Sequence, residues 1–237
     1  MARRERRSEL HSDIAFVEKD IYQQKKKPAL IFPKSPQQRI YDKLLHNPDT
    51  DMVISVGPAG SGKTLFACSA GIRALQKGCY KKIVLTRPTV SVDEQHGFLP
   101  GDLNKKMEPW TKPIFDIFEE YYHPRHLSAM LQDGVIEICP LAYMRGRTFK
   151  NAWVIADEMQ NATSNQMKML LTRIGDGSKF VITGDLEQHD RGYEENGLQH
   201  FIDLLQRNPS DRLGYVQMRN EDVQRHPAVV EILNMYK

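Results

Sequence analysis

One eight-residue stretch, at positions 57–64, constrains this chain more than any other part of its sequence. It reads Gly-Pro-Ala-Gly-Ser-Gly-Lys-Thr and lies between an apolar run at 52–56 and a helix-favouring stretch at about 63–77. Glycines let the backbone take positive φ values and wrap closely around an anion, and the start of a helix adds partial positive charge. The pattern GxxxxGK[ST] in this setting therefore predicts a phosphate-binding loop, or P-loop.

The end of this loop carries the predicted chemistry. Lys63 is expected to reach the β- and γ-phosphates of ATP, and the Thr64 hydroxyl to ligate Mg²⁺. The alternative is a glycine-rich turn that merely contains a lysine, and the strand-loop-helix setting argues against it. The predicted nucleotide-binding residues of the loop are Gly57, Pro58, Ala59, Gly60, Ser61, Gly62, Lys63, Thr64 and Leu65.

Short apolar runs and helical stretches alternate along the rest of the chain. A helix start is marked by Ser35 and Pro36, a capping residue followed by proline in the first turn. Apolar runs separated by helices predict an α/β fold, with a mostly parallel sheet buried under helices on both faces. The predicted strands lie at 52–56, 82–86, 135–139, 152–156, 180–183 and 213–218, and the helices at about 63–77, 102–122, 163–174, 194–207 and 226–236.

Polar residues follow two of these strands, where a parallel sheet binds its ligands. Asp157 and Glu158 come directly after the run 152–156, and a buried strand end is a costly place for two carboxylates without a role. Asp157 is predicted to hold Mg²⁺, and Glu158 to accept the proton of an attacking water. Gln188 follows the run 180–183 and is predicted to contact the γ-phosphate or that water. The alternative for Asp157 and Glu158 is an ordinary solvated start of a loop. The alternative for Gln188 is an ordinary Gly-Asp turn after a strand.

Four arginines are candidates for phosphate contacts, because the guanidinium fork donates two parallel hydrogen bonds. Arg87, Arg145 and Arg147, together with the lysines near 104–112, are the candidate nucleic-acid surface. Arg225 precedes the last predicted helix. A surface salt bridge is the alternative for each. Glu221, four residues before Arg225, offers such a partner.

Composition limits the remaining function classes. The chain has 237 residues, of which 40% are apolar and 27% charged. It has no apolar run of the roughly 20 residues that cross a bilayer, and no apolar segment follows the basic N-terminus as in an export signal. Three scattered cysteines exclude a disulfide framework. We therefore expect a cytoplasmic protein with no membrane partner. His123 and His126 form a close pair but lack the further ligands of a metal site.

The first 34 residues differ from the rest. Residues 1–27 hold eight basic and five acidic residues, which accounts for the whole formal net charge of +3. The remainder is close to neutral and carries no chain-wide nucleic-acid signal. Leu10, Ile14, Val17 and Ile21 are spaced as in a helix over 8–22. We expect a basic leader over 1–34, partly helical or flexible, and one domain over 35–237.

From about Ser35 to Tyr236 the chain resembles the PhoH family, the phosphate-starvation-inducible predicted ATPases. FLPGDL and MRGRT are among the matches and are not general P-loop features. The matching stretches are SPQQ (35–38), GPAGSGKT (57–64), IVLTRP (83–88), GFLPGDL (97–103), PLAYMRGRT (140–148), DEMQNAT (157–163), QMKMLLTR (166–173), ITGD (182–185) and RHP (225–227).

The resemblance implies a RecA-like P-loop NTPase core similar to the first core of superfamily 1 helicases. In those enzymes a glutamine ahead of the P-loop reads adenine, and Gln38 is the matching position. Gly184, Asp185 and Gln188 match their third motif. Such helicases close a second core over ATP, and 237 residues supply only one. A leader of 34 residues is also too short for the RNA-binding or nuclease domain of some relatives.

Three functions remain open. The first is a Mg²⁺-dependent ATPase that acts on RNA or single-stranded DNA as a homo-oligomeric ring, which we expect to be a hexamer. In it, Arg225 of one subunit, or Arg191 in reserve, completes the site of the next. The second is a slow ATPase that works as a nucleotide-dependent regulatory protein without strand separation. The third, a small-molecule kinase, is disfavoured because Gln188 and the acidic pair suit water better than an acceptor hydroxyl.

Overall fold

The computed structural model describes residues 31–88, 103–188 and 196–224, together with the helical positions 228, 229, 231 and 235; for 103–110 it describes only the backbone. Six strands form one sheet in the order β3-β2-β4-β5-β1-β6, and every neighbouring pair is parallel. The strands are β1 Met52–Val56, β2 Lys82–Thr86, β3 Ile136–Ile138, β4 Ala152–Ala156, β5 Lys179–Gly184 and β6 Leu213–Gln217.

The register brings the carboxyl ends of the central strands to one edge of the sheet. Val56 pairs with Gly184, and Thr86 pairs with Ala156. The residues that follow β1, β2, β4 and β5 therefore lie beside one another, although they are far apart in the sequence. This edge is where the predicted P-loop and the acidic pair meet.

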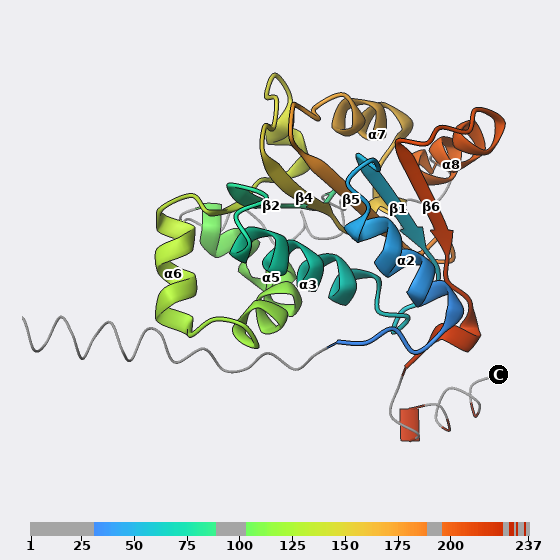
Figure 1. Ribbon diagram of the computed structural model, residues 1–237, viewed down its shortest axis with the longest axis horizontal. Coiled ribbons are helices and arrows are strands. Elements are labelled where there is room, and N and C mark those ends of the chain that lie inside the picture. Colours follow the sequence, from blue (N-terminus) through green and yellow to red (C-terminus); the bar gives the residue numbers. More distant parts are fainter. Residues whose placement is uncertain are drawn as a thin grey trace, which may run out of the picture.

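Helices cover both faces of the sheet (Figure 1). Trp153 and Val181 are buried in the core under the first group of helices, and Phe180 and Val154 in the core under the second. The strands are therefore apolar on both sides, as predicted. The first group is α2 Pro36–His46, α3 Lys63–Gln76, α5 Leu103–Glu119 and α6 Pro124–Gln132; the second is α7 Ser164–Leu171, α8 Gly197–Arg207 and the short 3-10 helices η1 Leu141–Met144 and η2 Met159–Asn161.

The predicted α/β class is confirmed, and each predicted strand lies within one or two residues of an observed one. Helix α2 begins as expected: the Ser35 hydroxyl accepts from the Gln38 N–H at 3.1 Å. Helix α6 was not predicted. Its start is marked by His123, which caps the helix from its ring, and by Pro124 in the first turn. The predicted helix at 163–174 ends early at Leu171, because Ile174 forms a β-bridge with Phe149.

Packing also fixes α3, which follows the P-loop, and α2. The Trp153 indole N–H donates to the Ala67 carbonyl at 3.2 Å, and α3 can approach so closely because residue 71 is glycine. A Cβ at Gly71 would lie 2.6 Å from the Trp153 ring. Buried Lys179 binds the end of α2 through three main-chain carbonyls. Helices α2 and α3 are thus held firmly against the sheet.

The leader helix predicted at 8–22 lies outside the described residues, and the helix predicted at 226–236 lies largely outside them. The division into a leader over 1–34 and a domain over 35–237 stays a prediction. Within the described ranges, no helix has both the length and the apolar character needed to cross a membrane.

Candidate active site

The loop after β1 has the backbone that its glycines permit. Gly57, Gly60 and Gly62 have φ values of 140°, 82° and 90°, in the region that side chains with a Cβ rarely adopt. Space is short as well, since a Cβ at Gly57 would lie 2.4 Å from the Met218 carbonyl oxygen. Gly62 directly precedes α3, so the loop opens into the start of that helix. This is the geometry of an anion cradle.

Lys63 is buried at the start of α3, with 9% of its surface exposed. Its Nζ donates to the carbonyls of Gly57 at 2.6 Å and Pro58 at 2.9 Å. Burial lowers the pKa of Lys63, and the nearby charges of Asp185, Asp157 and Glu158 oppose that shift. The lysine therefore faces three carboxylates at the edge where the strands end.

Asp157 joins the P-loop to two neighbouring strands. Its Oδ1 accepts from the Thr64 hydroxyl at 2.9 Å and from the Thr183 hydroxyl at the end of β5. Thr64 and Asp157, the two predicted Mg²⁺ ligands, are therefore in contact. Thr183 is a functional contact that the sequence analysis missed. Its position one residue before the Gly184-Asp185 turn was the available signal.

Glu158 takes an unusual backbone conformation, with φ 54° and ψ 36°. A non-glycine residue pays a conformational cost in this left-handed region, and such costs concentrate at functional sites. Its Oε2 accepts from the Gln160 side-chain amide at 2.6 Å. The strand end thus turns sharply at Glu158 and holds the carboxylate in one place.

Gln160 connects the acidic pair to the turn after β5. Its Oε1 accepts from the Asp185 N–H at 3.0 Å, and its Nε2 donates to the Gln188 carbonyl at 3.2 Å as well as to Glu158. The Gln188 side chain in turn donates to Asp185 Oδ2 at 2.8 Å. Buried Gln160 is a second residue whose role the sequence analysis missed, because its partners Asp185 and Gln188 follow another strand.

A cavity of about 400 Å³ gathers most of the predicted site. Gln224 and Ile117 also line it and were not predicted. Of the predicted residues, Gly57, Pro58 and Ser61 belong to the loop but are not in the cavity lining. The predicted residues that line it are Ala59, Gly60, Gly62, Lys63, Thr64, Leu65, Asp157, Glu158, Gly184, Asp185 and Gln188.

The model of the family described as "PhoH-like protein" matches residues 30–237 of this chain. The chain belongs to this family. The parallel sheet, the loop after β1 and the acids after β4 all lie within the matched residues. The resemblance seen in the motifs is thereby confirmed over nearly the whole described chain.

Similar proteins include the PhoH-like protein of Bacillus subtilis strain 168, 45% identical over 78% of this chain and 58% of that protein. The PhoH-like protein of Synechocystis is 38% identical over 93% of this chain and 66% of that protein, and protein PhoH of Escherichia coli K12 is 38% identical over 78% and 52%. The chain thus spans only part of the length of these relatives. The crystal structure of Pif1 helicase from Candida albicans superposes with a TM-score of 0.38 at 14% identity, covering 86% of this chain and 44% of that one, a likeness too low to carry an argument.

Gln38, the remaining residue predicted to bind the nucleotide, does not line the 400 Å³ cavity. It is 2% exposed, and its amide is hydrogen-bonded to main-chain groups of the P-loop and of the chain after β6. The resemblance implied that the Gln38 amide reads adenine. In this structure the same amide is instead bound to main-chain groups.

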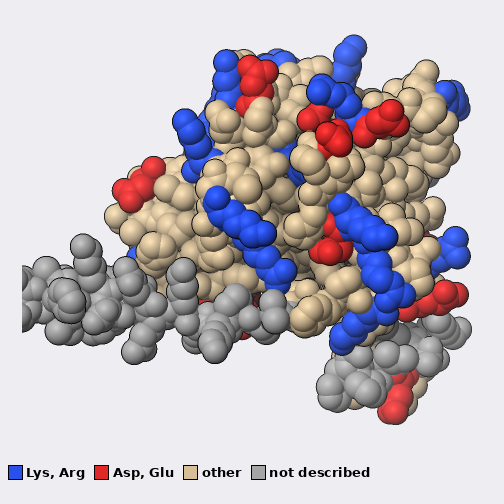
Figure 2. Space-filling model, viewed as in Figure 1, with Lys and Arg blue, Asp and Glu red and all other residues tan. Residues whose placement is uncertain are grey.

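The candidate arginines are less uniform than predicted. Arg147 forms an ion pair with Glu137 at 2.5 Å and lies over the Phe149 ring, 4.7 Å from its centre. This hydrogen bond to Glu137 raises the pKa of Arg147. Arg145 is exposed and Arg87 half-buried, while Arg225 and Arg191 lie outside the described residues. On the face shown in Figure 2, basic and acidic side chains intermingle.

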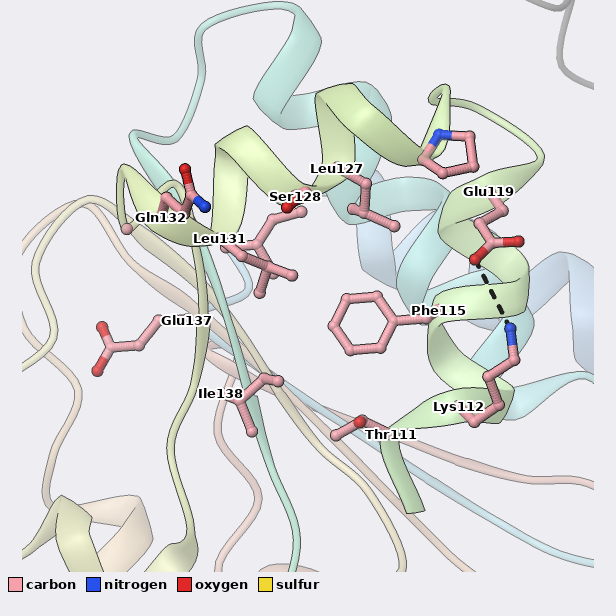
Figure 3. A pocket seen from close by; sticks show the side chains of 13 residues that line it. Thr111, Lys112, Phe115, Glu119, Leu127, Ser128, Leu131, Gln132, Glu137 and Ile138 are labelled. Atoms are coloured by element: carbon pink, nitrogen blue, oxygen red, sulfur yellow. Dashed lines mark ion pairs between the residues drawn. The ribbon is translucent and has the colours of Figure 1, made fainter. Parts of the chain in front are cut away.

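A larger cavity of about 610 Å³ lies away from this edge, between α5, α6 and the edge strand β3 (Figure 3). Phe115, Leu131 and Ile138 converge on it from these three elements. On α5, Lys112 pairs with Glu119 at 3.6 Å. Its lining residues include none of those predicted for the nucleotide site. Its walls combine apolar side chains with the charged groups of Lys112, Glu119 and Glu137.

Proposed function

We propose that this PhoH-like chain is a Mg²⁺-dependent ATPase. One observation carries the proposal: Lys63, Thr64, Asp157 and Glu158 come from separate segments and line one cavity at the carboxyl ends of the strands. A cation, a hydroxyl and two carboxylates in that place are the parts that phosphoryl transfer to water requires.

The loop suits the phosphates of ATP because its glycines have no side chains to keep a phosphate away from the backbone N–H groups. Gly57 and Gly62 are the clearest cases, because both have positive φ values and a Cβ at Gly57 would lie 2.4 Å from the Met218 carbonyl oxygen. Lys63 Nζ now donates to two loop carbonyls. We infer that it exchanges these for phosphate oxygens, which bind the ammonium more strongly.

Mg²⁺ fits the donor set, since it prefers hard oxygen ligands and usually takes only one or two from the protein beside phosphates and waters. Thr64 and Asp157 supply such oxygens in direct contact. When bound, the ion neutralises charge on the outer phosphates. Asp157 is held for this role by Thr183, which donates to the same oxygen.

Glu158 is the proposed base for the attacking water, and Gln188 the residue that senses or orients that water. Gln160 donates to Glu158 Oε2 and therefore restrains the carboxylate beside the cavity. The same amide also contacts the main chain at 185 and 188. A change at the γ-phosphate can thus be passed from the acidic pair to the turn after β5.

We further propose that hydrolysis is coupled to RNA or single-stranded DNA in a cytoplasmic homo-oligomeric ring, with a hexamer as the expected size. Among the candidate contacts with nucleic acid, Arg87 and Arg145 are better supported than Arg147, because Arg147 would first have to leave its ion pair with Glu137. A ring lets Arg225 of one subunit, or Arg191, reach the ATP of the next, a contribution of about 10³–10⁵ in rate. The alternative is a slow regulatory ATPase without strand-separating activity.

The deciding experiment measures ATP turnover with and without Mg²⁺, RNA and single-stranded DNA. We expect Mg²⁺-dependent hydrolysis that a single-stranded probe accelerates, and binding of that probe that weakens with salt. Hydrolysis that no single-stranded nucleic acid changes would favour the regulatory alternative. If the wild type hydrolyses no ATP, both the nucleic-acid-coupled ATPase and the regulatory ATPase are rejected.

A mixing experiment tests the ring. Arg225→Ala subunits keep the P-loop, and Lys63→Ala subunits keep the arginine, so each should be inactive alone while mixed rings recover part of the activity. Lys77→Ala, at the exposed end of α3, is the matched control and should mix without effect. A fully active monomer would disprove the shared site.

A further inference from the structure

The side-chain amide of Gln38 has no free hydrogen-bonding position. Its Oε1 accepts from the N–H groups of Lys34 at 2.8 Å and Ser35 at 3.3 Å. Its Nε2 donates to the carbonyls of Ser61 at 3.1 Å and Asp222 at 3.2 Å. An amide offers two N–H donors and two acceptor lone pairs. All four are therefore used, on a side chain that is 2% exposed.

These four bonds tie together three segments that meet at the P-loop. They are the start of α2, the loop itself at Ser61, and the 3-10 turn η3, Asn220–Asp222, in the chain after β6. Figure 1 shows the start of α2 beside that chain. The Asp222 carboxylate accepts from the Arg219 N–H at 2.6 Å and so fixes the turn that presents its carbonyl to Gln38.

The same stretch, 218–224, contacts the P-loop at two further points. Its first residue, Met218, lies against Gly57 so closely that a Cβ there would clash. Its last residue, Gln224, donates its N–H to the Gly60 carbonyl at 3.0 Å and lines the 400 Å³ cavity. The position of this stretch and the position of the loop thus depend on each other, with Gln38 between them.

We propose that Gln38 is a positioning residue, which holds the P-loop against the stretch 218–224, and that it does not read the nucleotide base. A base contact would exchange one neutral hydrogen bond of Gln38 for another and leave a buried main-chain group unpaired, which is costly. The exchange proposed for Lys63 differs, because its ammonium gains charged phosphate partners. The proposal rests on the nucleotide hydrolysis proposed above. It follows that any preference for ATP over GTP comes from groups other than Gln38.

The test compares kcat/KM for ATP and GTP in the wild type, Gln38→Met and Gln38→Ala. Losing the two bonds to Ser61 and Asp222 should lower kcat/KM about tenfold or more for both nucleotides. The ATP-to-GTP ratio should stay within about twofold of the wild type, since a factor of two is well below one such bond. A ratio that falls tenfold in the Gln38 variants would overturn the proposal.

Ser35→Ala is the matched structural control. It removes the hydroxyl that caps the same helix start but leaves the contacts of Gln38 with Ser61 and Asp222. Its melting temperature should fall while kcat/KM stays near the wild type. If Ser35→Ala loses as much kcat/KM as Gln38→Met, Gln38 acts only through the stability of α2 and the positioning role is wrong.

A wild-type measurement avoids the risk that a variant misfolds. An ATP analogue whose purine N7 is replaced by carbon should be hydrolysed as well as ATP if the Gln38 amide stays with its main-chain partners. A tenfold loss with this analogue that vanishes in Gln38→Met would show a base contact instead. If the wild type hydrolyses no nucleotide, the proposed function fails separately. The ratio of ADP to GDP affinity in wild type and Gln38→Met then gives the same test by binding alone.

Discussion

Lys63 and Lys179 lie at opposite ends of the sheet and are similar in almost every local respect. Both are buried, with 9% and 3% of their surfaces exposed, and both donate to main-chain carbonyls. Burial lowers the pKa of each, in the case of Lys179 to about 8. A lysine that is buried and hydrogen-bonded is therefore not by itself a sign of function.

The surroundings of the two ammonium groups differ. Lys63 has three carboxylates near it and lines a cavity, so its charge has both compensation and a space in which to meet a ligand. Lys179 has the carbonyls of Leu44, Leu45 and Asn47, with the ring of Trp153 at 5.9 Å. Only Asp51 opposes the lowering of its pKa. Lys179 satisfies the carbonyls at the end of α2. Lys63 lies where it can exchange its carbonyl partners for those of a ligand.

The largest expected effect follows from removing Lys63. Lys63→Ala should abolish measurable ATP hydrolysis, because the main cation for the β- and γ-phosphates is lost. Mg·ATP at about a hundred times Kd should stabilise the wild type by about 2.7 kcal/mol, and the variant much less. Thermal denaturation with and without Mg·ATP measures both. Lys77→Ala is the control, and equal shifts in wild type and Lys63→Ala would contradict the P-loop assignment.

The next effect concerns Glu158, one of the three carboxylates whose charges act on Lys63. Glu158→Gln keeps the shape of the side chain but cannot take a proton, so turnover should fall by roughly 10²–10⁴ while ATP affinity is largely kept. Single-turnover hydrolysis and nucleotide titration separate the two quantities. Glu187→Gln, an exposed glutamate on the neighbouring turn, should behave as the wild type. Normal turnover in Glu158→Gln would place the base elsewhere.

Sequence patterns predicted one end of the sheet far better than the other. The P-loop and the acidic pair are local motifs whose chemistry requires particular neighbours, so their place in the fold followed from spacing alone. Lys179 starts a strand like many surface lysines, and its carbonyl partners lie more than 130 residues away in the sequence. The roles of Gln160 and Thr183, and the pairing of Arg147 with Glu137, likewise depend on contacts between strands that no local pattern encodes.

Removing Lys179 should reverse the pattern seen with Lys63. Lys179→Ala leaves the carbonyls at the end of α2 without their buried donor, which should cost about 1–3 kcal/mol of unfolding free energy. ATP turnover per folded molecule should change little, because Lys179 does not line the cavity. Urea denaturation and an ATPase assay on the same samples measure the two effects. A variant with full stability and impaired turnover would remove the distinction between the two lysines.

The smallest effect is a pH dependence that belongs to Lys179. The pKa of Lys179 in the folded chain is about 8, and that of an unperturbed lysine is 10.5. Between these values the unfolded chain holds a proton that the folded chain has released, so unfolding becomes less favourable as pH rises. The wild type should therefore gain up to about 1 kcal/mol per pH unit relative to Lys179→Met between about pH 8 and 10.5.

Methionine keeps the apolar stem but has no charge to titrate. The comparison is made by urea denaturation of both proteins at several pH values, because the difference cancels the titration of other groups. A difference that stays flat across this window would mean that the three carbonyls keep Lys179 charged as firmly as water does, and its burial would then resemble that of Lys63 more closely.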